Sequence, residues 1–411
     1  MISEEQIDLL VERLVQRTEQ ANIYFYKKIG EILKQLKSLR PTEAHQLVQI
    51  FKYGGTYEEI VKQIAKYTNL NIADIDDIFK SYAKRDGYFY ESFYKYRNIP
   101  FVPFSENVAI RTQTQALANI IKTEMYDYFR SNVIGFTIND EFKNIKDTYN
   151  YLLDEALLNV GQGKETFDSA MSRILKDIGG SGLKTINYAS GRSMRLDSAV
   201  RMHLKSGLRE LHNENQKIYG EEFGADGVEI SVHSNPAPDH ALAQGRQFSI
   251  IRPNNNELSE WEKLQAGEEA KDYKGRVITL DHDHKNGYRP ISEMNCYHYV
   301  FSIILGVNKP QYDDNELNSI IKANKEGFEY EGKKYTMYEG TQLQRALERK
   351  IREQKDIQIL AKASGDDNLV GEAQQKITQL THKYKELSDA SGLPFKYDRL
   401  KVAGYRRTKT K

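Results

Sequence analysis

The sequence predicts an α+β protein with a mostly helical N-terminal region, a central α+β module of short strands and a C-terminal helical hairpin. Three observations support this prediction. Apolar residues recur at helical spacing in the first third of the chain and again after residue 340. Between these regions, residues 228–232 alternate apolar and polar side chains, as a half-buried strand does. Polar loops rich in Asn, Asp, Gly and Pro follow up to about residue 295, which is typical of short strands joined by turns.

The composition excludes several classes of protein. The 411 residues carry 59 Lys and Arg against 58 Asp and Glu, so the formal net charge is +1. This balance argues against a chain-wide nucleic-acid binder, although it allows a local basic patch. No apolar run approaches the ~18 residues of a membrane span, and the N-terminus lacks the features of a secretory signal, so we expect no membrane partner. The single cysteine, Cys296, excludes an internal disulfide and fits a reducing compartment.

The N-terminal region predicts a series of helices. Ser3 can cap the first helix, with Gln6 completing a capping box. A second helix begins near Thr42 and a third covers residues 57–67. Two glycine-containing pairs predict breaks in this series, namely Gly54-Gly55 and Asp86-Gly87.

Residues 88–104 form an aromatic segment whose helix should stop near Pro100 and Pro103. Two interpretations stay open: an aromatic core segment, and a docking surface for another protein. Stacking of single-stranded nucleic acid is a third, weaker interpretation, because Lys95 and Arg97 are the only interleaved cations. The candidates for a protein interface are Tyr88, Phe89, Tyr90, Phe93, Tyr94 and Tyr96.

Residues 147–178 predict one or two helices, which the glycine cluster at 179–182 ends as a C-cap and turn. Residues 193–211 predict a further, basic helix, and the last sixteen residues are also basic. Both segments offer contacts to nucleic-acid phosphates through counterion release. A solvated helix face and a disordered basic end are the alternatives. The candidates for nucleic-acid contact are Arg192, Arg195, Arg201, Arg406 and Arg407.

The central module contains the residues that could carry chemistry. Residues 228–232 and the apolar run 299–305 predict strands, and seven of the nine histidines lie between positions 203 and 298. Four imidazole and thiolate groups could bind zinc, or could instead satisfy loop backbone groups by hydrogen bonding. The candidate zinc ligands are His233, His240, Cys296 and His298, and the same part of the chain holds His282 and His284.

No strong enzymatic signature accompanies these residues. Cys296 with His298 is the only cysteine–histidine pair suited to nucleophilic catalysis, and no G-x-S-x-G motif is present. A metal-dependent nuclease or nucleotide transferase built on residues 228–305 remains a competing hypothesis, based on the histidine cluster.

The final third predicts two antiparallel helices. Leu343, Leu347 and Ile351 step by four residues, residues 364–367 make a turn, and apolar residues recur at heptad-like steps over 373–387. We therefore divide the chain into four regions, which cover residues 1–146 (helical), 147–225 (helical with the basic helix), 226–312 (α+β module) and 313–411 (hairpin and basic tail).

Several stretches, taken in order and spacing, resemble one known family. They are Ser231–His240, Gln244–Phe248, Asn295–His298, Gly306 with Pro310–Tyr312, and Tyr338–Arg345 continuing to Arg352. Over about residues 185–405 the chain resembles the second minor capsid protein of tailed bacteriophages of Gram-positive hosts, which is usually encoded next to the portal and is related to Mu-type head morphogenesis proteins. In this resemblance, residues 226–312 form the minor capsid module.

The resemblance implies a non-enzymatic structural component of the virion, present in few copies inside the phage head and in the host cytoplasm before assembly. Its partners would be the portal protein and other capsid components, with packaged double-stranded DNA as a further contact. It would act in head assembly, DNA packaging or DNA delivery, and it would need no cofactor other than the zinc considered above. From composition, we place portal docking in the helical N-terminal region.

Overall fold

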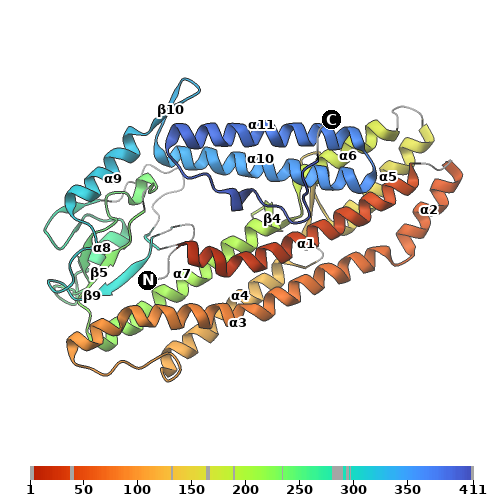
Figure 1. The fold of residues 1–411 in the computed structure, drawn as a ribbon. Coiled ribbons are helices and arrows are strands. Elements are labelled where there is room, and N and C mark those ends of the chain that lie inside the picture. Colours follow the sequence, from red (N-terminus) through yellow and green to blue (C-terminus); the bar gives the residue numbers. More distant parts are fainter. Residues whose placement is uncertain are drawn as a thin grey trace. The chain divides into compact units, whose positions relative to one another are not determined.

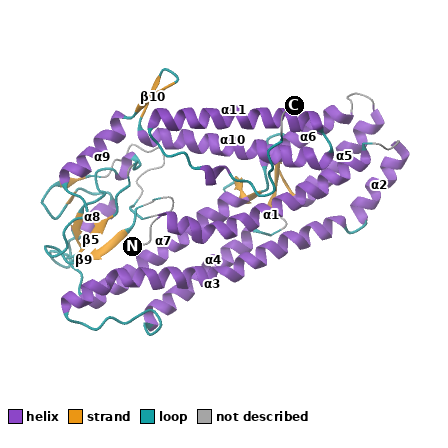
Figure 2. Cartoon of the chain, viewed as in Figure 1, coloured by secondary structure: helices purple, strands orange, loops and turns teal. Residues whose placement is uncertain are grey.

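The computed structural model describes residues 4–37, 41–130, 133–162, 167–187, 190–233, 235–279, 290–292, 296 and 298–408 (Figures 1 and 2). Helices account for 64% of the structure, and the remaining regular elements are short strands in small antiparallel sheets. The predicted α+β class is confirmed. Among the described helices, none combines the length and the apolar composition of a membrane span.

Long helices dominate both halves of the chain. The N-terminal part contains α1 (Glu4–Leu36), α2 (Pro41–Tyr53), α3 (Thr56–Arg97) and α4 (Val108–Tyr128). The middle contains α5 (Ile145–Gln162), α6 (Phe167–Ser181), α7 (Leu196–Phe223) and the short α8 (Glu260–Ala266). The C-terminal part contains α9 (Asp314–Glu326), α10 (Met337–Ser364) and α11 (Asp367–Ser391). The predicted break at Gly54-Gly55 separates α2 from α3, and the predicted glycine C-cap follows α6, where Gly182 has a φ of 64°.

The predicted break at Asp86-Gly87 is wrong, because α3 runs through both residues. Gly87 allows α7 to approach α3 closely and does not form a turn. An added Cβ would lie 2.5 Å from the hydroxyl oxygen of Tyr219 on α7. Asp86 is buried, and its Oδ1 lies 2.8 Å from Nδ1 of His212, also on α7. The Asp-Gly pair, which is typical of turns, here lies inside a helix and lets α3 pack against α7.

The chain forms two compact units, each of which collects segments that are far apart in the sequence. Unit 1 comprises Met1–Asp8, Asp76–Ile121 and Leu204–Gln342. Unit 2 comprises Leu9–Ile75, Lys122–His203 and Leu343–Lys411. The unit boundaries fall within α1, α3, α4, α7 and α10, so each of these helices contributes residues to both units. The division into four consecutive regions stays a prediction.

Unit 2 contains a four-stranded antiparallel sheet with the order β2-β1-β3-β4. Its strands are β1 (Ile134–Ile138), β2 (Glu141–Asn144), β3 (Lys184–Asn187) and β4 (Arg192–Arg195). The predicted basic helix 193–211 is therefore correct from Leu196 onward, but its first residues pair with β3 as a strand. Phe136 of β1 stacks on Phe25 of α1 with ring centroids 4.7 Å apart, which anchors the sheet on that helix.

Unit 1 contains the three-stranded sheet β6-β5-β9 and two hairpins. Both predicted strands are confirmed, as β5 (Gly227–Ile230) and β9 (Val300–Ile303), which pair antiparallel with Val228 opposite Ser302. Val228 and Ile230 face the core, as the alternating pattern predicts. The other strands are β6 (Gln247–Ser249), β7 (Ala270–Lys271), β8 (Val277–Ile278), β10 (Phe328–Tyr330) and β11 (Lys333–Tyr335).

The predicted C-terminal hairpin is confirmed as α10 and α11, which run side by side (Figure 1). Gly365, with a φ of 74°, makes the turn between them. Tyr384 of α11 donates a 2.8 Å hydrogen bond to Glu348 of α10. The alternative of a disordered basic end is wrong up to residue 408, because Ala403 N–H donates to Glu19 of α1 at 3.0 Å and Thr408 N–H donates to Gln374 of α11 at 3.0 Å.

A buried ionic network lies at the centre of unit 2. Arg195, at the end of β4, contacts Asp356 of α10 at 2.8 Å and Asp197 of α7 at 3.1 Å. Arg352 of α10 contacts the second oxygen of Asp197 at 2.5 Å. The side chain of Asp356 is fully buried and that of Arg195 is 10% exposed. Both charges have therefore lost contact with water, and their mutual attraction has to compensate for the lost hydration energy.

We expect Arg195→Ala to lower the free energy of unfolding by about 3–5 kcal/mol, because it removes the ion-pair partner of the fully buried Asp356 and leaves Asp197 with Arg352 alone. The matched control is Arg192→Ala in the same strand, whose exposed side chain should change stability by less than about 0.5 kcal/mol. Chemical denaturation of both variants measures the difference. Equal stability of the two variants would contradict a structural role for the network.

Glu19 gives unit 2 a pH dependence. Burial, together with the charge of Asp197, raises the pKa of Glu19 from 4.5 to about 7. The folded chain therefore holds this proton more tightly than the unfolded chain, and the associated stability is present below about pH 4.5 and is lost as the pH rises through about 7. We expect Glu19→Gln to stabilise the protein by about 3 kcal/mol at pH 8, with little effect near pH 4. Denaturation curves at both pH values test this, and a pH-independent difference would contradict it.

Candidate metal centre and charged pocket

The sheet of unit 1 positions the candidate chemistry. Core residues Val228, Ile230, Phe248 and Val300 hold β5, β6 and β9 together. Pro238–His240 form a 3-10 turn that follows β5 in the chain, and Cys296 and His298 come shortly before β9. Since β5 and β9 are paired neighbours, the segment after one strand and the segment before the other meet at the same edge of the sheet.

Three of the four predicted zinc ligands converge at this edge. Sγ of Cys296 lies 3.4 Å from Nδ1 of His240 and 3.5 Å from Nδ1 of His298. One ligand atom from each of the three residues lies within 4.8 Å of the other two. His240 and Cys296 are each 1% exposed and His298 is 3% exposed, so all three are buried. We call these three residues the His–Cys cluster.

The fourth predicted ligand, His233, lies beside the cluster rather than in it. Its ring packs edge-on against the ring of His298, with centroids 4.7 Å apart. Its ligand atoms are not part of the group that His240, Cys296 and His298 form among the described residues. His282 and His284 lie outside the described residues.

Neighbouring acceptors fix which ring nitrogens face the sulfur. Nε2 of His298 lies 3.4 Å from Oε1 of Gln244, and Nε2 of His240 lies 3.7 Å from Oδ2 of Asp239. An amide oxygen and a carboxylate favour a proton on each Nε2, which leaves the lone pair of each Nδ1 directed at Cys296. The same Gln244 oxygen accepts a 2.9 Å hydrogen bond from the backbone N–H of His233, which fixes its orientation.

The thiol of Cys296 is shifted towards its ionised form. Burial raises the pKa of Cys296, whereas the adjacent ring of His240 and the backbone of His298 and Ser292 lower it, and the net result lies below the ordinary value of 9.0. Two imidazoles around one thiolate-prone sulfur form a nitrogen and sulfur donor set of the kind that binds zinc.

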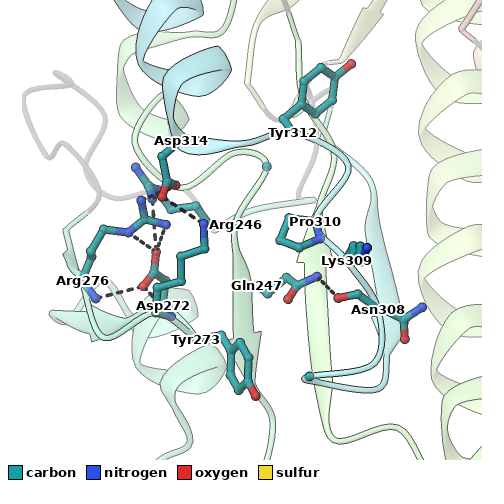
Figure 3. Close-up of a pocket in the computed structure, with 13 residues that line it drawn as sticks. Arg246, Gln247, Asp272, Tyr273, Arg276, Asn308, Lys309, Pro310, Tyr312 and Asp314 are labelled. Atoms are coloured by element: carbon teal, nitrogen blue, oxygen red, sulfur yellow. Dashed lines mark hydrogen bonds and ion pairs between the residues drawn. The ribbon is translucent and has the colours of Figure 1, made fainter.

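A charged pocket of about 250 Å³ lies in the same unit (Figure 3). Its wall comes from the start of β6, from the turn between β7 and β8, and from the segment between β9 and α9. Asp272 lies between two arginines, with Oδ2 at 3.1 Å from Arg246 Nη1 and 2.8 Å from Arg276 Nε. Arg276 also pairs with Asp314, which lies 2.9 Å from Lys274. Lys309 adds a fourth cation, so the lining holds four cationic side chains and two carboxylates.

The turn Gln244-Gly245-Arg246 connects the two features. Gln244 faces the His–Cys cluster, and Arg246 faces the pocket. Gly245 between them has a φ of 69°, and its N–H donates a 2.9 Å hydrogen bond to the carbonyl of Ile230. The sequence reasoning did not predict a role for Gln244 or for the pocket residues Asp272, Arg276 and Asp314. Gln244 and Arg246 lie in Gln244–Phe248, one of the stretches that carry the family resemblance, so this signal could have pointed to them. Asp272 lies in a loop where the sequence shows no motif and no periodicity.

A family model described as "Phage minor capsid protein 2" matches residues 2–389, which is nearly the whole chain. The chain belongs to this family. No curated protein and no solved structure shows a match. The resemblance inferred from the motifs is thereby confirmed, and it extends over the N-terminal region, where no motif was identified. The chain is a structural protein of a bacteriophage virion that interacts with other head components.

In this minor capsid protein, most of the aromatic segment belongs to the core. Tyr90, Phe93 and Tyr94 are buried, and each packs on Phe223 of α7. Phe89 is half-buried and lies 5.2 Å from the ring of Phe301 on β9. The core interpretation is therefore correct for the three buried residues, whose burial leaves them unavailable for docking, and Phe89 packs inward on β9 while staying partly exposed. Two of the interface candidates, Tyr88 and Tyr96, are 56% and 59% exposed.

The arginine candidates of the minor capsid protein also divide into two groups. Arg195 is part of the buried ionic network, and Arg201 contacts Glu12 of α1 at 2.8 Å with its side chain 20% exposed. The structure thus assigns Arg195 to internal pairing and corrects its proposed contact with nucleic acid. Arg192, Arg406 and Arg407 are exposed, and nucleic-acid contact stays a prediction for them.

We expect Gly245→Ala to cost roughly 3 kcal/mol or more of stability, because it adds a clash to the cost of a left-handed backbone. An added Cβ would lie 2.5 Å from Leu317 and 2.7 Å from Val232. Gly275→Ala is the matched control: its φ is 80°, but an added Cβ meets no described atom within 4 Å, so only the ~1–2 kcal/mol backbone cost applies. Denaturation of both variants measures the difference, and equal losses would show that the turn is not tightly packed.

Proposed function

We propose that this minor capsid protein associates with the portal on the inner face of the phage head and acts there, without catalysis, in head assembly, DNA packaging or DNA delivery. The observation that carries the proposal is the family match over residues 2–389, which includes residues of both compact units. Before assembly the chain is expected in the host cytoplasm. The proposal concerns the partner and the stage of action, whereas membership of the structural family is given by the match itself.

Burial of the His–Cys cluster supports a structural rather than a catalytic use. A catalytic metal keeps a coordination position open to water or substrate. His240, Cys296 and His298 are each at most 3% exposed, so a nucleic-acid or nucleotide substrate does not reach their ligand atoms in this conformation. This favours the structural proposal over a nuclease or nucleotide transferase built on residues 228–305.

The portal-docking surface that we propose lies at the C-terminal end of α3 and the segment that follows it. Large apolar side chains are exposed there in a short stretch of chain, namely Tyr88, Tyr96, Ile99, Val102 and Val108, which we call the Tyr88–Val108 surface. Interfaces are enriched in tyrosine, and exposed apolar side chains gathered in one region mark interaction sites. The buried Tyr90, Phe93 and Tyr94 beneath hold this stretch on α7.

Contact with packaged double-stranded DNA is part of the same proposal and rests on the exposed side chains of Arg192, Arg406 and Arg407. Phosphate contacts of this kind supply affinity without reading sequence. With a formal net charge of +1, the chain as a whole adds little to this attraction, so DNA contact would be local and would weaken with salt.

We expect the full chain to bind the portal protein encoded beside it, and the double variant Tyr88→Ala/Tyr96→Ala to weaken binding by about 10-fold or more, because tyrosines at the centre of an interface typically contribute above ~1 kcal/mol each. Biolayer interferometry with immobilised portal measures the affinities. The matched control is Tyr53→Ala/Tyr126→Ala, two tyrosines that are 83% and 57% exposed elsewhere on the chain and should leave binding unchanged.

Two results would contradict this proposal at different levels. Failure of the wild-type chain to bind the portal, together with its absence from purified virions, would reject portal association. Wild-type binding that survives in the Tyr88/Tyr96 variant would keep portal association but reject the Tyr88–Val108 surface. Circular dichroism of each variant confirms that the fold is intact.

A further inference from the structure

We propose that His240, Cys296 and His298 bind a Zn²⁺ ion through Nδ1, Sγ and Nδ1, as a structural metal centre of the β5–β6–β9 module. The inference does not depend on the portal proposal, because it concerns how unit 1 is held together rather than what it contacts. The three ligands come from two loops that flank a pair of hydrogen-bonded strands, so a metal there would fasten the two loops to each other.

The observed distances agree with tetrahedral zinc geometry. With Zn–S of about 2.3 Å and Zn–N of about 2.0–2.1 Å, a tetrahedral angle places a sulfur and a nitrogen ligand about 3.5–3.6 Å apart. The two sulfur–nitrogen distances in the cluster are 3.4 and 3.5 Å. Each sulfur–nitrogen pair therefore has the separation of two ligands of one ion, and the three ligand atoms all lie within 4.8 Å of one another.

Oxygen atoms on the far side of both rings favour this use of the two histidines. Oε1 of Gln244 lies 3.4 Å from Nε2 of His298, and Oδ2 of Asp239 lies 3.7 Å from Nε2 of His240. A proton on each Nε2 makes the Nδ1 of each ring, beside the sulfur, the atom that can donate its lone pair to a cation. The arrangement of carboxylate or amide oxygen, histidine and metal is the usual outer shell of a zinc site.

The donor set selects the metal. Two imidazoles and one thiolate are nitrogen and soft sulfur donors, which zinc accepts and which magnesium and calcium, as oxygen-binding cations, do not prefer. Three protein ligands leave the fourth tetrahedral position of the ion to a water molecule, and burial of all three ligands keeps a large substrate away from that position. We do not place His233 among the ligands, because its ring packs against His298 outside the group of three.

The test begins with the full-length wild-type chain, purified with a phosphine reductant and no added chelator. We expect about one zinc per chain by mass spectrometry of the metal, and a lower melting temperature after removal of zinc with a chelator. Replacement of zinc by Co²⁺ should produce the near-ultraviolet absorption of a cobalt–thiolate bond. This readout needs no mutation, so it does not depend on whether a variant folds.

Variants then assign the ligands. Cys296→Ser should abolish the cobalt–thiolate absorption, and Cys296→Ser or His298→Ala should lower zinc affinity more than the roughly 10–100-fold that loss of an outer-shell partner costs. His382→Ala, at an exposed histidine in α11, is the matched control and should bind zinc as the wild type does. His233→Ala should retain zinc within a few-fold.

Two results would overturn the inference. A wild-type chain that contains only trace zinc and shows no cobalt–thiolate absorption on addition of Co²⁺ would leave the cluster as a set of hydrogen bonds. Full zinc affinity in Cys296→Ser would place the metal elsewhere in the chain. Loss of zinc in His233→Ala would reject the three-residue ligand set.

Discussion

Unit 2 depends on charges that have been taken out of water. Ion pairs between residues more than 150 positions apart in the sequence bring together the end of a strand and two helices, through Arg195, Arg352, Asp197 and Asp356. An apolar core tolerates sliding, but each of these charges must meet its particular partner, because an unpaired buried charge costs several kcal/mol. The network therefore fixes the register of α10 against the start of α7, and the α10–α11 hairpin takes its position in unit 2 from it.

Sequence reasoning predicted those parts of the fold that depend on local pattern. Helical spacing located the α10–α11 hairpin, and alternation located β5, since both follow from the periodicity of the backbone itself. It failed at Asp86-Gly87 because the reason for the glycine is a neighbour, Tyr219, more than a hundred residues away. It also read Arg195 as a surface cation, because nothing local distinguishes a solvated arginine from one that pairs with a buried aspartate.

The candidate metal centre was predictable in its ligand types but not in its geometry. Cys296 and His298 are two positions apart in the sequence, a spacing that places both side chains on one face of a strand. The side chains that orient their nitrogen atoms, Asp239 and Gln244, are ordinary polar residues until the fold brings them to the rings. Their roles exist only in three dimensions, which is why an outer shell is the part of a site that a single sequence conceals.

The turn at Gly245 indicates why the His–Cys cluster and the charged pocket occur together. The side chains on the two sides of this glycine point in different directions. Gln244 contacts His298, while Arg246 pairs with Asp272. A glycine is required because Leu317 of α9 and Val232 occupy the space where a Cβ would lie. Packing of α9 therefore holds one turn, and that turn orients a neutral outer-shell amide on one side and a buried cation on the other. The His–Cys cluster and the charged pocket thus share one backbone turn. Because close-packed structure transmits strain, a displacement at the pocket would also have to move the side chain that contacts the cluster, and this coupling helps a structural protein to keep its shape.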